Sequence, residues 1–246
     1  MPVARTPIKH WANRSFLRCL DREVAAAGLA IHGEFGTRVR QHAAEIARRH
    51  PAPDAPSRFI VDGCALVLAT FQEMVAGGAS RQDAFEVVRR AVLDSYRGPM
   101  TLVGRGYRLV FWFSSDPVRT LGRLTPRALR WGQRVFGRAM EFDSSVHHGR
   151  VEWHITRCPF HEFFLAEGEP VLTRVFSQLD LLWMEEASRS RRPIGAERPE
   201  TLSTGGERCR FCFVRTDDSG AAVPDIVRDQ WTDVRIELRK QDGGVE

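Results

Sequence analysis

The residues of this chain best suited to chemistry gather in its last third. Cys158 lies between His154 and His161, Asp180 interrupts an apolar helical stretch, and Cys209 follows within about sixty residues. Thiols, imidazoles and carboxylates are the side chains that perform nucleophilic, acid–base and metal chemistry. The rest of the chain has no comparable concentration of them, so a functional hypothesis starts here.

Cys158 is predicted to end a strand, directly before Pro159 and a helix that begins near Phe160. A helix N-terminus lowers the pKa of a nearby thiol, because unpaired N–H groups stabilise the thiolate. With His154 or His161 as its partner, the thiol would be an activated nucleophile, or the pair would ligate a metal. The structural alternative is a buried cysteine flanked by surface histidines.

A zinc site at Cys209-x-x-Cys212 is disfavoured by strand geometry. Residues 207–215 are strand-like, and residues three apart on a strand point to opposite faces, about 10 Å apart along the backbone. Only one of the two thiols can then belong to a given site. The candidate metal ligands are Cys158, His161 and Cys209.

Asp180 is an acid on an apolar helical face, and such a group needs a partner or a function. A salt bridge to Arg174 or a backbone cap would be structural explanations. Ser177 lies one turn earlier on the same face, so the two side chains could line one pocket.

The first half of the chain must position this region with helices. Apolar residues recur at helical spacing over four segments, and Ser80 with Asp83 resembles a capping box. Val103 to Phe113 is rich in β-branched and aromatic residues, which predicts a strand or a buried segment. Thr125-Pro126 predicts the start of a helix that runs to about Met140. The four helical segments are residues 12–30, 36–50, 57–75 and 80–97.

After Gly149 the pattern alternates. It predicts a strand with Val151, Trp153 and Ile155 on one face, and Glu152, His154, Thr156 and Cys158 on the other. Helices are expected from Phe160 to Leu165 and from Pro170 to about Ala187. Residues 191–200 are polar and broken by prolines, and the tip beyond Lys240 is expected to be disordered.

The predicted fold class is α+β, with an N-terminal helical part packed on a small antiparallel sheet. Residues 1–100 form the helical part, 101–220 the core with the Cys/His/Asp cluster and 221–246 a polar tail, within one compact domain overall.

Composition restricts the partners. The 246 residues are 43% apolar and 27% charged, with a net charge of +5 carried almost entirely by scattered arginines. This scatter favours solvated helix faces over nucleic-acid binding. The chain shows no secretory signal, and its longest apolar run, Phe59 to Phe71, is too short to span a bilayer. We therefore expect a cytoplasmic protein with reduced thiols, a small-molecule substrate and no membrane partner; a homo-oligomer is compatible with the sequence.

Several of these motifs together resemble the L-2-amino-thiazoline-4-carboxylic acid hydrolase family over roughly residues 100–215. Members typically show a strand ending in Cys, a Cys-x-x-Asp on the following helix and a late Gly-x-x-Cys-x-Phe strand. Here Ser177 replaces the first residue of Cys-x-x-Asp, and Asp180 is retained. The residues that carry the resemblance are Cys158-Pro-Phe, Asp180, Thr201-Leu202 with Gly205, and Cys209-Arg-Phe-Cys-Phe.

The resemblance implies a reaction. The family's name reaction adds water at C2 of a cyclic isothiourea-like ring and expels the ring sulfur. Cys158 would attack C2 or hold a metal that activates water, a histidine would act as acid and base, and Asp180 would pair with the amidinium. The candidate catalytic residues are Cys158, His161, His154 and Asp180, and the candidate substrate-binding residues are Ser177, Arg157, Arg215, Thr201 and Cys209.

The cofactor expectations are few. The Gly-containing segment 201–206 has no P-loop lysine, so no nucleotide cofactor is expected, and a divalent metal is the one cofactor considered. A competing hypothesis from another class is a non-catalytic binding or sensor module with a strand-edge cysteine beside an apolar pocket. A third is a biosynthetic tailoring enzyme that acts on a sulfur- or nitrogen-containing ring.

Overall fold

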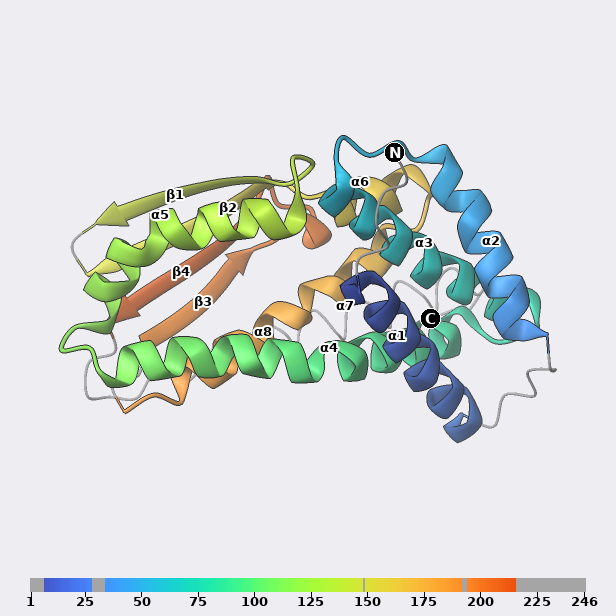
Figure 1. The fold of residues 1–246 in the computed structure, drawn as a ribbon, viewed down its shortest axis with the longest axis horizontal. Helices are drawn as coiled ribbons and strands as arrows, with labels where there is room; N and C mark the ends of the chain where they lie inside the picture. The colour runs from blue at the N-terminus through green and yellow to red at the C-terminus, as the bar shows by residue number, and fades with distance from the viewer. Residues whose placement is uncertain (1–6, 28–33, 148, 192–193, 216–246) are drawn as a thin grey trace, which may run out of the picture.

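A computed structural model describes residues 7–27, 34–147, 149–191 and 194–215 (Figure 1). Helices and a four-stranded antiparallel sheet of order β1-β2-β4-β3 confirm the predicted α+β class. The longer helices are α1 (Pro7–Ala26), α2 (Phe35–Arg49), α3 (Ala55–Ala76), α4 (Arg81–Trp112), α5 (Pro117–Phe136), α6 (Pro159–Ala166) and α8 (Leu179–Ser188), and α7 (Thr173–Ser177) is a single short turn. The strands are β1 (Glu141–His147), β2 (Arg150–Arg157), β3 (Ile194–Glu200) and β4 (Cys209–Arg215).

α3 is the central helix of the helical part, where α1, α2, α6 and the first half of α4 surround the main apolar core. Asp54 caps its N-terminus by accepting a hydrogen bond from Ser57 N at 2.8 Å. The predicted cap of α4 is confirmed, because Ser80 Oγ accepts from Asp83 N. By length and composition α3 is also the one helix among the described residues that could cross a membrane, but 61% of its apolar window is buried inside the fold.

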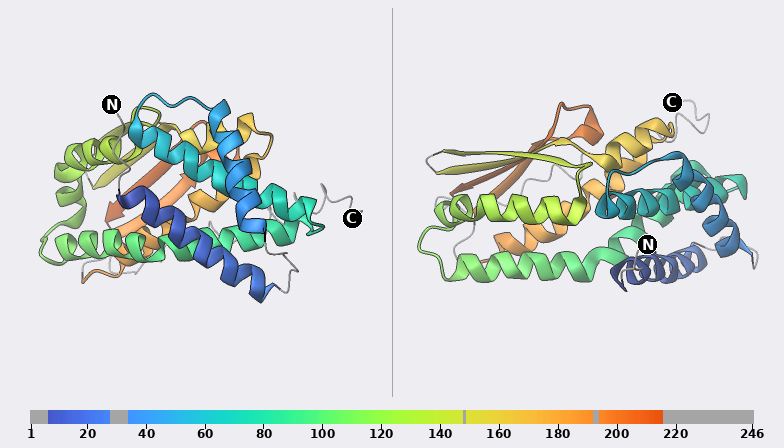
Figure 2. Two further views of the ribbon diagram at one scale, coloured as in Figure 1. Left: turned by 45° about the vertical axis from the view of Figure 1, so that its right-hand side comes forward. Right: turned by 45° about the horizontal axis from the view of Figure 1, so that its top comes forward.

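The sheet confirms the predicted alternation of β2 for Trp153 and Ile155 but not for Cys158, because the strand ends at Arg157 and Cys158 precedes α6 instead of continuing the face of His154. Trp153 pairs with Phe211 and Ile155 with Cys209, and these side chains join a second apolar cluster with α4 and α8. Glu152 pairs with Cys212 on the other face. Figure 2 shows the sheet as a layer above α5 and α4, so its apolar face is directed toward these helices.

Two predictions about the middle of the chain are wrong. Val103 to Phe113 is helical, because α4 continues through Pro99 to Trp112 and packs its aromatic residues against α8 and the sheet. The next helix begins at Pro117, with Asp116 as its N-cap. Thr125 therefore lies inside α5, where its hydroxyl donates to Leu121 O and accepts from Trp153 Nε1.

Later elements also differ from the prediction. The helix expected from Pro170 is divided into a 3-10 turn (Pro170–Leu172), α7 and α8. The polar stretch 191–200 contains β3. A proline is tolerated there because β3 is an edge strand, and its register with β4 shifts between Glu197 and Glu200. The predicted disordered tip lies outside the described residues.

α4 and α8 pack closely at Gly104. A Cβ atom on Gly104 would lie 2.5 Å from Glu186 Cβ and 2.8 Å from Trp183 O. Only glycine permits this approach without a shift of one helix. The distance sets where α8, which carries Asp180 and Trp183, lies relative to the sheet.

We predict that Gly104→Ala lowers the free energy of unfolding by about 1–3 kcal/mol, because the added methyl group must separate α4 from α8. Gly106→Ala is the matched control. A Cβ there meets nothing within 4 Å, and alanine in an exposed helix interior stabilises by roughly 0.5–1 kcal/mol. Urea unfolding of both variants tests this. Equal unfolding midpoints for Gly104→Ala and Gly106→Ala would show that α4 and α8 are not tightly packed at Gly104.

Candidate functional site

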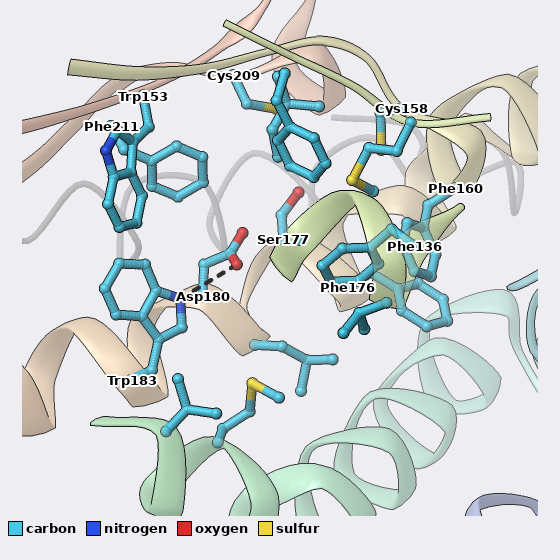
Figure 3. A pocket seen from close by; sticks show the side chains of 18 of the residues that line it. Phe136, Trp153, Cys158, Phe160, Phe176, Ser177, Asp180, Trp183, Cys209 and Phe211 are labelled. Carbon is cyan, nitrogen blue, oxygen red and sulfur yellow. Dashed lines mark hydrogen bonds between the residues drawn. The ribbon is translucent and has the colours of Figure 1, made fainter. Parts of the chain in front are cut away.

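A cavity of about 320 Å³ lies between α3, α4, α5, α7, α8 and the apolar face of the sheet. Its lining is mostly aromatic and aliphatic, and Figure 3 shows two aromatic groups on either side of a polar cluster. Trp153 and Trp183 stack with ring centroids 6.2 Å apart. Aromatic walls of this kind suit a planar apolar group. One group comprises Tyr107, Trp153, Trp183 and Phe211, and the other Phe136, Phe160 and Phe176.

The polar cluster unites residues from four elements. Figure 3 shows Cys158, Ser177, Asp180 and Cys209 in the region between the two aromatic groups. Cys158 precedes α6, Ser177 ends α7, Asp180 lies in the first turn of α8 and Cys209 begins β4. Four residues predicted from the sequence are therefore brought to one cavity.

Asp180 is the only carboxylate among the described residues that line the cavity. Its Oδ2 lies 3.3 Å from Arg198 Nη1, and its Oδ1 accepts a hydrogen bond from Trp183 Nε1 at 3.4 Å. Burial raises the pKa of this carboxyl, while the Arg198 charge and the Trp183 hydrogen bond oppose the rise. The group is thus a stronger base than an ordinary aspartate.

Arg198 contacts both Asp180 and Ser177 in this cluster, and the sequence analysis missed it. Its side chain is 6% exposed, donates from Nη1 to Ser177 O at 2.6 Å and lies 4.9 Å above the ring of Phe211. Its Nε is buried and has no hydrogen-bond partner among the described residues. The signal was available as alternation, because Ile194, Ala196 and Arg198 are all buried on one strand.

The thiol of Cys158 does not have the lowered pKa that its place before a helix predicts. Burial raises the pKa to about 12, although the backbone N–H groups of Phe160 and His161 act in the opposite direction. Desolvation of the thiolate outweighs these two hydrogen bonds. The thiol is therefore protonated at neutral pH. Cys209, also buried, accepts a hydrogen bond from Leu202 N at 3.5 Å.

Ser177 connects the cavity to a chain of hydroxyl groups. Its Oγ lies 3.1 Å from Ser203 Oγ, which is 2.9 Å from Thr201 Oγ1. Thr201 is 1% exposed and does not line the cavity. It contacts the site only through Ser203, so it supports the position of Ser177 from behind.

The remaining predicted residues do not line the cavity. His154 lies on the other face of the sheet, where its Nε2 is 3.1 Å from Glu152 Oε2. Arg157 is half exposed and pairs with Glu162, and Arg215 pairs with Asp116. His161 is also absent from the lining; burial lowers its pKa, and its Nδ1 has no hydrogen-bond partner among the described residues.

The candidate metal ligands are likewise not gathered. Cys158 and Cys209 line the cavity, but His161 does not. Across the part of the chain that the structure describes, no group of three or more His, Cys, Asp and Glu side chains could hold a metal ion. The donor set does not fit a protein-held metal, and we derive no step through one.

Comparison with solved structures and with curated proteins gives no support for a function. An unliganded Fe(II) H-NOX protein from K. algicida shares 11% identity over 83% of this chain and 96% of its own, with a TM-score of 0.33. An H-NOX protein from S. oneidensis in the Fe(II)NO state shares 13% identity over 82% and 98%, with a TM-score of 0.31. These scores are too low to support an argument. No curated protein matches the chain.

The comparison with known families, by contrast, identifies the family of the chain. Residues 60–213, more than half of the chain, match the L-2-amino-thiazoline-4-carboxylic acid hydrolase family. The matched segment includes the whole polar cluster, all of β2 and the first five residues of β4. The chain belongs to the L-2-amino-thiazoline-4-carboxylic acid hydrolase family.

Proposed function

We propose that this protein is a hydrolase that opens a C–S or C–N bond in a small heterocyclic or amidine-type substrate bound in the central cavity. The observation that carries the proposal is Asp180, a carboxylate of raised pKa in a mostly apolar cavity of a chain from this family. The aromatic walls favour a substrate with a planar apolar body. All five cysteines of the protein are free thiols, which is consistent with an enzyme that works in the reducing cytoplasm.

Asp180 suits both halves of such a reaction. As water bonds to C2 of a cationic isothiourea-type ring, the carboxylate takes one proton from the water. The C2–S bond then breaks, and the Asp180 carboxylic acid returns that proton to the leaving sulfur, which yields a thiol and a carbamoyl group. The second proton of the water, left on the C2 hydroxyl, passes to solvent as the carbonyl forms, and the nitrogens keep their protons. Burial favours this cycle because it brings the pKa of the acid nearer to neutral.

Cys158 would be a wall residue in this mechanism. A thiol with a pKa of about 12 attacks only after losing its proton, and Asp180 is the only carboxylate lining the described cavity that could accept it. Water needs the same base and forms no covalent intermediate that must be hydrolysed afterwards. Arg198 would keep Asp180 ionised and hold it beside Ser177.

The second candidate function is non-catalytic binding of a planar apolar molecule. The observation in its favour is the lining itself, which is aromatic and aliphatic apart from one small cluster, and which contains no histidine among the described residues. A binder would retain affinity without turnover. The variants below separate the two functions.

We predict that Asp180→Asn lowers the rate of thiol release from 2-amino-thiazoline by at least about 100-fold, because the amide can neither take nor return a proton. Thiol release is followed with a chromogenic disulfide. Asp143→Asn is the matched control, since Asp143 is exposed on the sheet and away from the cavity. Full turnover in Asp180→Asn would remove Asp180 as the acid–base group; binding without turnover in the wild type would favour the binding module.

We predict that Cys158→Ala retains turnover within roughly 10-fold of the wild type, because water and not the neutral thiol is the nucleophile. The same thiol-release measurement applies. A loss as large as that in Asp180→Asn, unrelieved in Cys158→Ser, would instead show that Cys158 attacks the substrate.

We predict that Arg198→Met lowers the free energy of unfolding by roughly 2 kcal/mol at pH 7.5, because Asp180 loses the positive charge beside it. Without Arg198 the pKa of Asp180 in the folded state rises further above its unfolded value. The loss of unfolding free energy is then fully present above the pKa that Asp180 has in the folded protein. It disappears as the Asp180 carboxyl takes up a proton at lower pH. Urea unfolding should therefore show a smaller difference from the wild type at pH 4.5.

Arg157→Met is the control for this measurement. Arg157 is half exposed and also forms an ion pair, so its loss should cost less than about 1 kcal/mol at either pH. An equal loss in Arg198→Met at both pH values would contradict the coupling to Asp180.

A further inference from the structure

The helix α5 collects on one face the positive charge that looks scattered in the sequence. Its twenty residues contain five arginines and no acidic residue. All five are exposed, at positions three or four apart, so they form one stripe along the helix. The stripe consists of Arg119, Arg123, Arg127, Arg130 and Arg134.

Four of these arginines form no ion pair with any residue that the structure describes. Arg119 lies near Asp116, whose pKa its charge helps to lower. For the other four, no carboxylate of the described chain lies within ion-pair distance. Elsewhere arginines pair readily, as Arg58 does with Asp62 and Arg89 with Glu86. In α5, by contrast, four arginines without an ion pair to a described residue follow one another along a single helix face.

The mouth of the cavity opens beside this stripe. Trp131 and Val135 line the cavity, yet they remain 54% and 41% exposed. Trp131 lies four residues after Arg127 and three before Arg134, so its indole borders the arginines. The opposite face of α5 is buried against the sheet through Val118 and Leu121. Charge, exposed indole and apolar opening therefore share one surface.

An anionic lipid bilayer complements each part of this surface. Arginines bind lipid phosphates, tryptophan prefers the headgroup region, and an apolar opening can face acyl chains. A polynucleotide would satisfy the arginines, but it would leave the opening of an apolar cavity covered by phosphate and sugar. Flat docking of α5 needs no rearrangement, because the helix already presents this face outward.

We propose that the exposed face of α5 is a docking surface for an anionic lipid bilayer, which brings the mouth of the cavity against the membrane. This departs from the expectation of no membrane partner, which was drawn from the lack of an apolar run long enough to span a bilayer. It also goes beyond the proposed reaction, and it holds or fails independently of hydrolysis. An apolar substrate could then enter the cavity from the bilayer without crossing water.

The test is sedimentation of the whole protein with vesicles, without any substrate. We expect binding to phosphatidylcholine vesicles that contain about one third phosphatidylglycerol, weak binding to pure phosphatidylcholine, and release at high salt. Arg127→Gln, Arg130→Gln and Arg134→Gln in one protein should weaken binding on the order of 100-fold, since each arginine near an anionic surface contributes roughly fivefold. Trp131→Gln should weaken it without a change of charge.

The matched control removes the same charge from α1 and α2, which lie at the other end of the molecule from α5 (Figure 1). It carries Arg18→Gln, Arg40→Gln and Arg48→Gln, three exposed positions, and should bind nearly as the wild type does. Three results would overturn the proposal: no binding to anionic vesicles, equal weakening in both triple variants, or tighter binding to a duplex DNA oligonucleotide than to the vesicles.

Discussion

The cavity depends on how closely α4 and α8 approach each other. Gly104 permits a contact with the backbone of Trp183 that any larger residue would prevent. α8 begins beside the cavity. The distance between α8 and α4 therefore determines how far Asp180 and Trp183 lie from the sheet. The sheet is fixed on the other side by Trp153, whose indole donates to Thr125 of α5. The two stacked tryptophans are thus held by two different helices.

This constraint explains how an acid comes to lie among aromatic rings. Asp180 has few polar neighbours, and the one cation beside it reaches the cavity from the edge strand β3. Arg198 is held over Phe211 and by Ser177 O, so its charge cannot move away from Asp180 without losing both contacts. Removing the Asp180–Arg198 ion pair from water costs the folded state free energy. Such a cost is typical of functional sites, where stability is exchanged for reactivity.

Of the residues proposed from the sequence, Cys158, Ser177, Asp180 and Cys209 line the cavity, whereas the two histidines, Arg157, Arg215 and Thr201 do not. Alternation placed Trp153 and Ile155 on the apolar face of β2, and strand geometry correctly separated Cys209 from Cys212. Asp180 and Ser177 were recognised because an acid on an apolar face is unusual. These inferences succeed because they rest on local periodicity.

Inferences that depend on tertiary contacts failed. Val103 to Phe113 has strand-like composition, but it belongs to α4: Tyr107 and Phe111 pack in the second apolar cluster, while Leu109 and Trp112 are exposed. The pKa of Cys158 depends on how deeply the residue is buried, and the sequence shows only its place before α6. Arg198 stayed hidden because Pro199 made an edge strand look like a loop.

The site and the surface around its mouth constrain the ligand together. The walls accept a planar apolar group, the polar cluster offers one acid and one guanidinium, and neither charge is free of the other. A permanently charged ligand would have to displace this ion pair, whereas an isothiourea-type ring could enter as its neutral base, hydrogen-bond to Asp180 and take up a proton in the cavity to become the cation of the proposed reaction. A ligand of that kind partitions into membranes. The same chemistry that fits the interior therefore fits a cavity that opens beside an exposed tryptophan and a row of arginines.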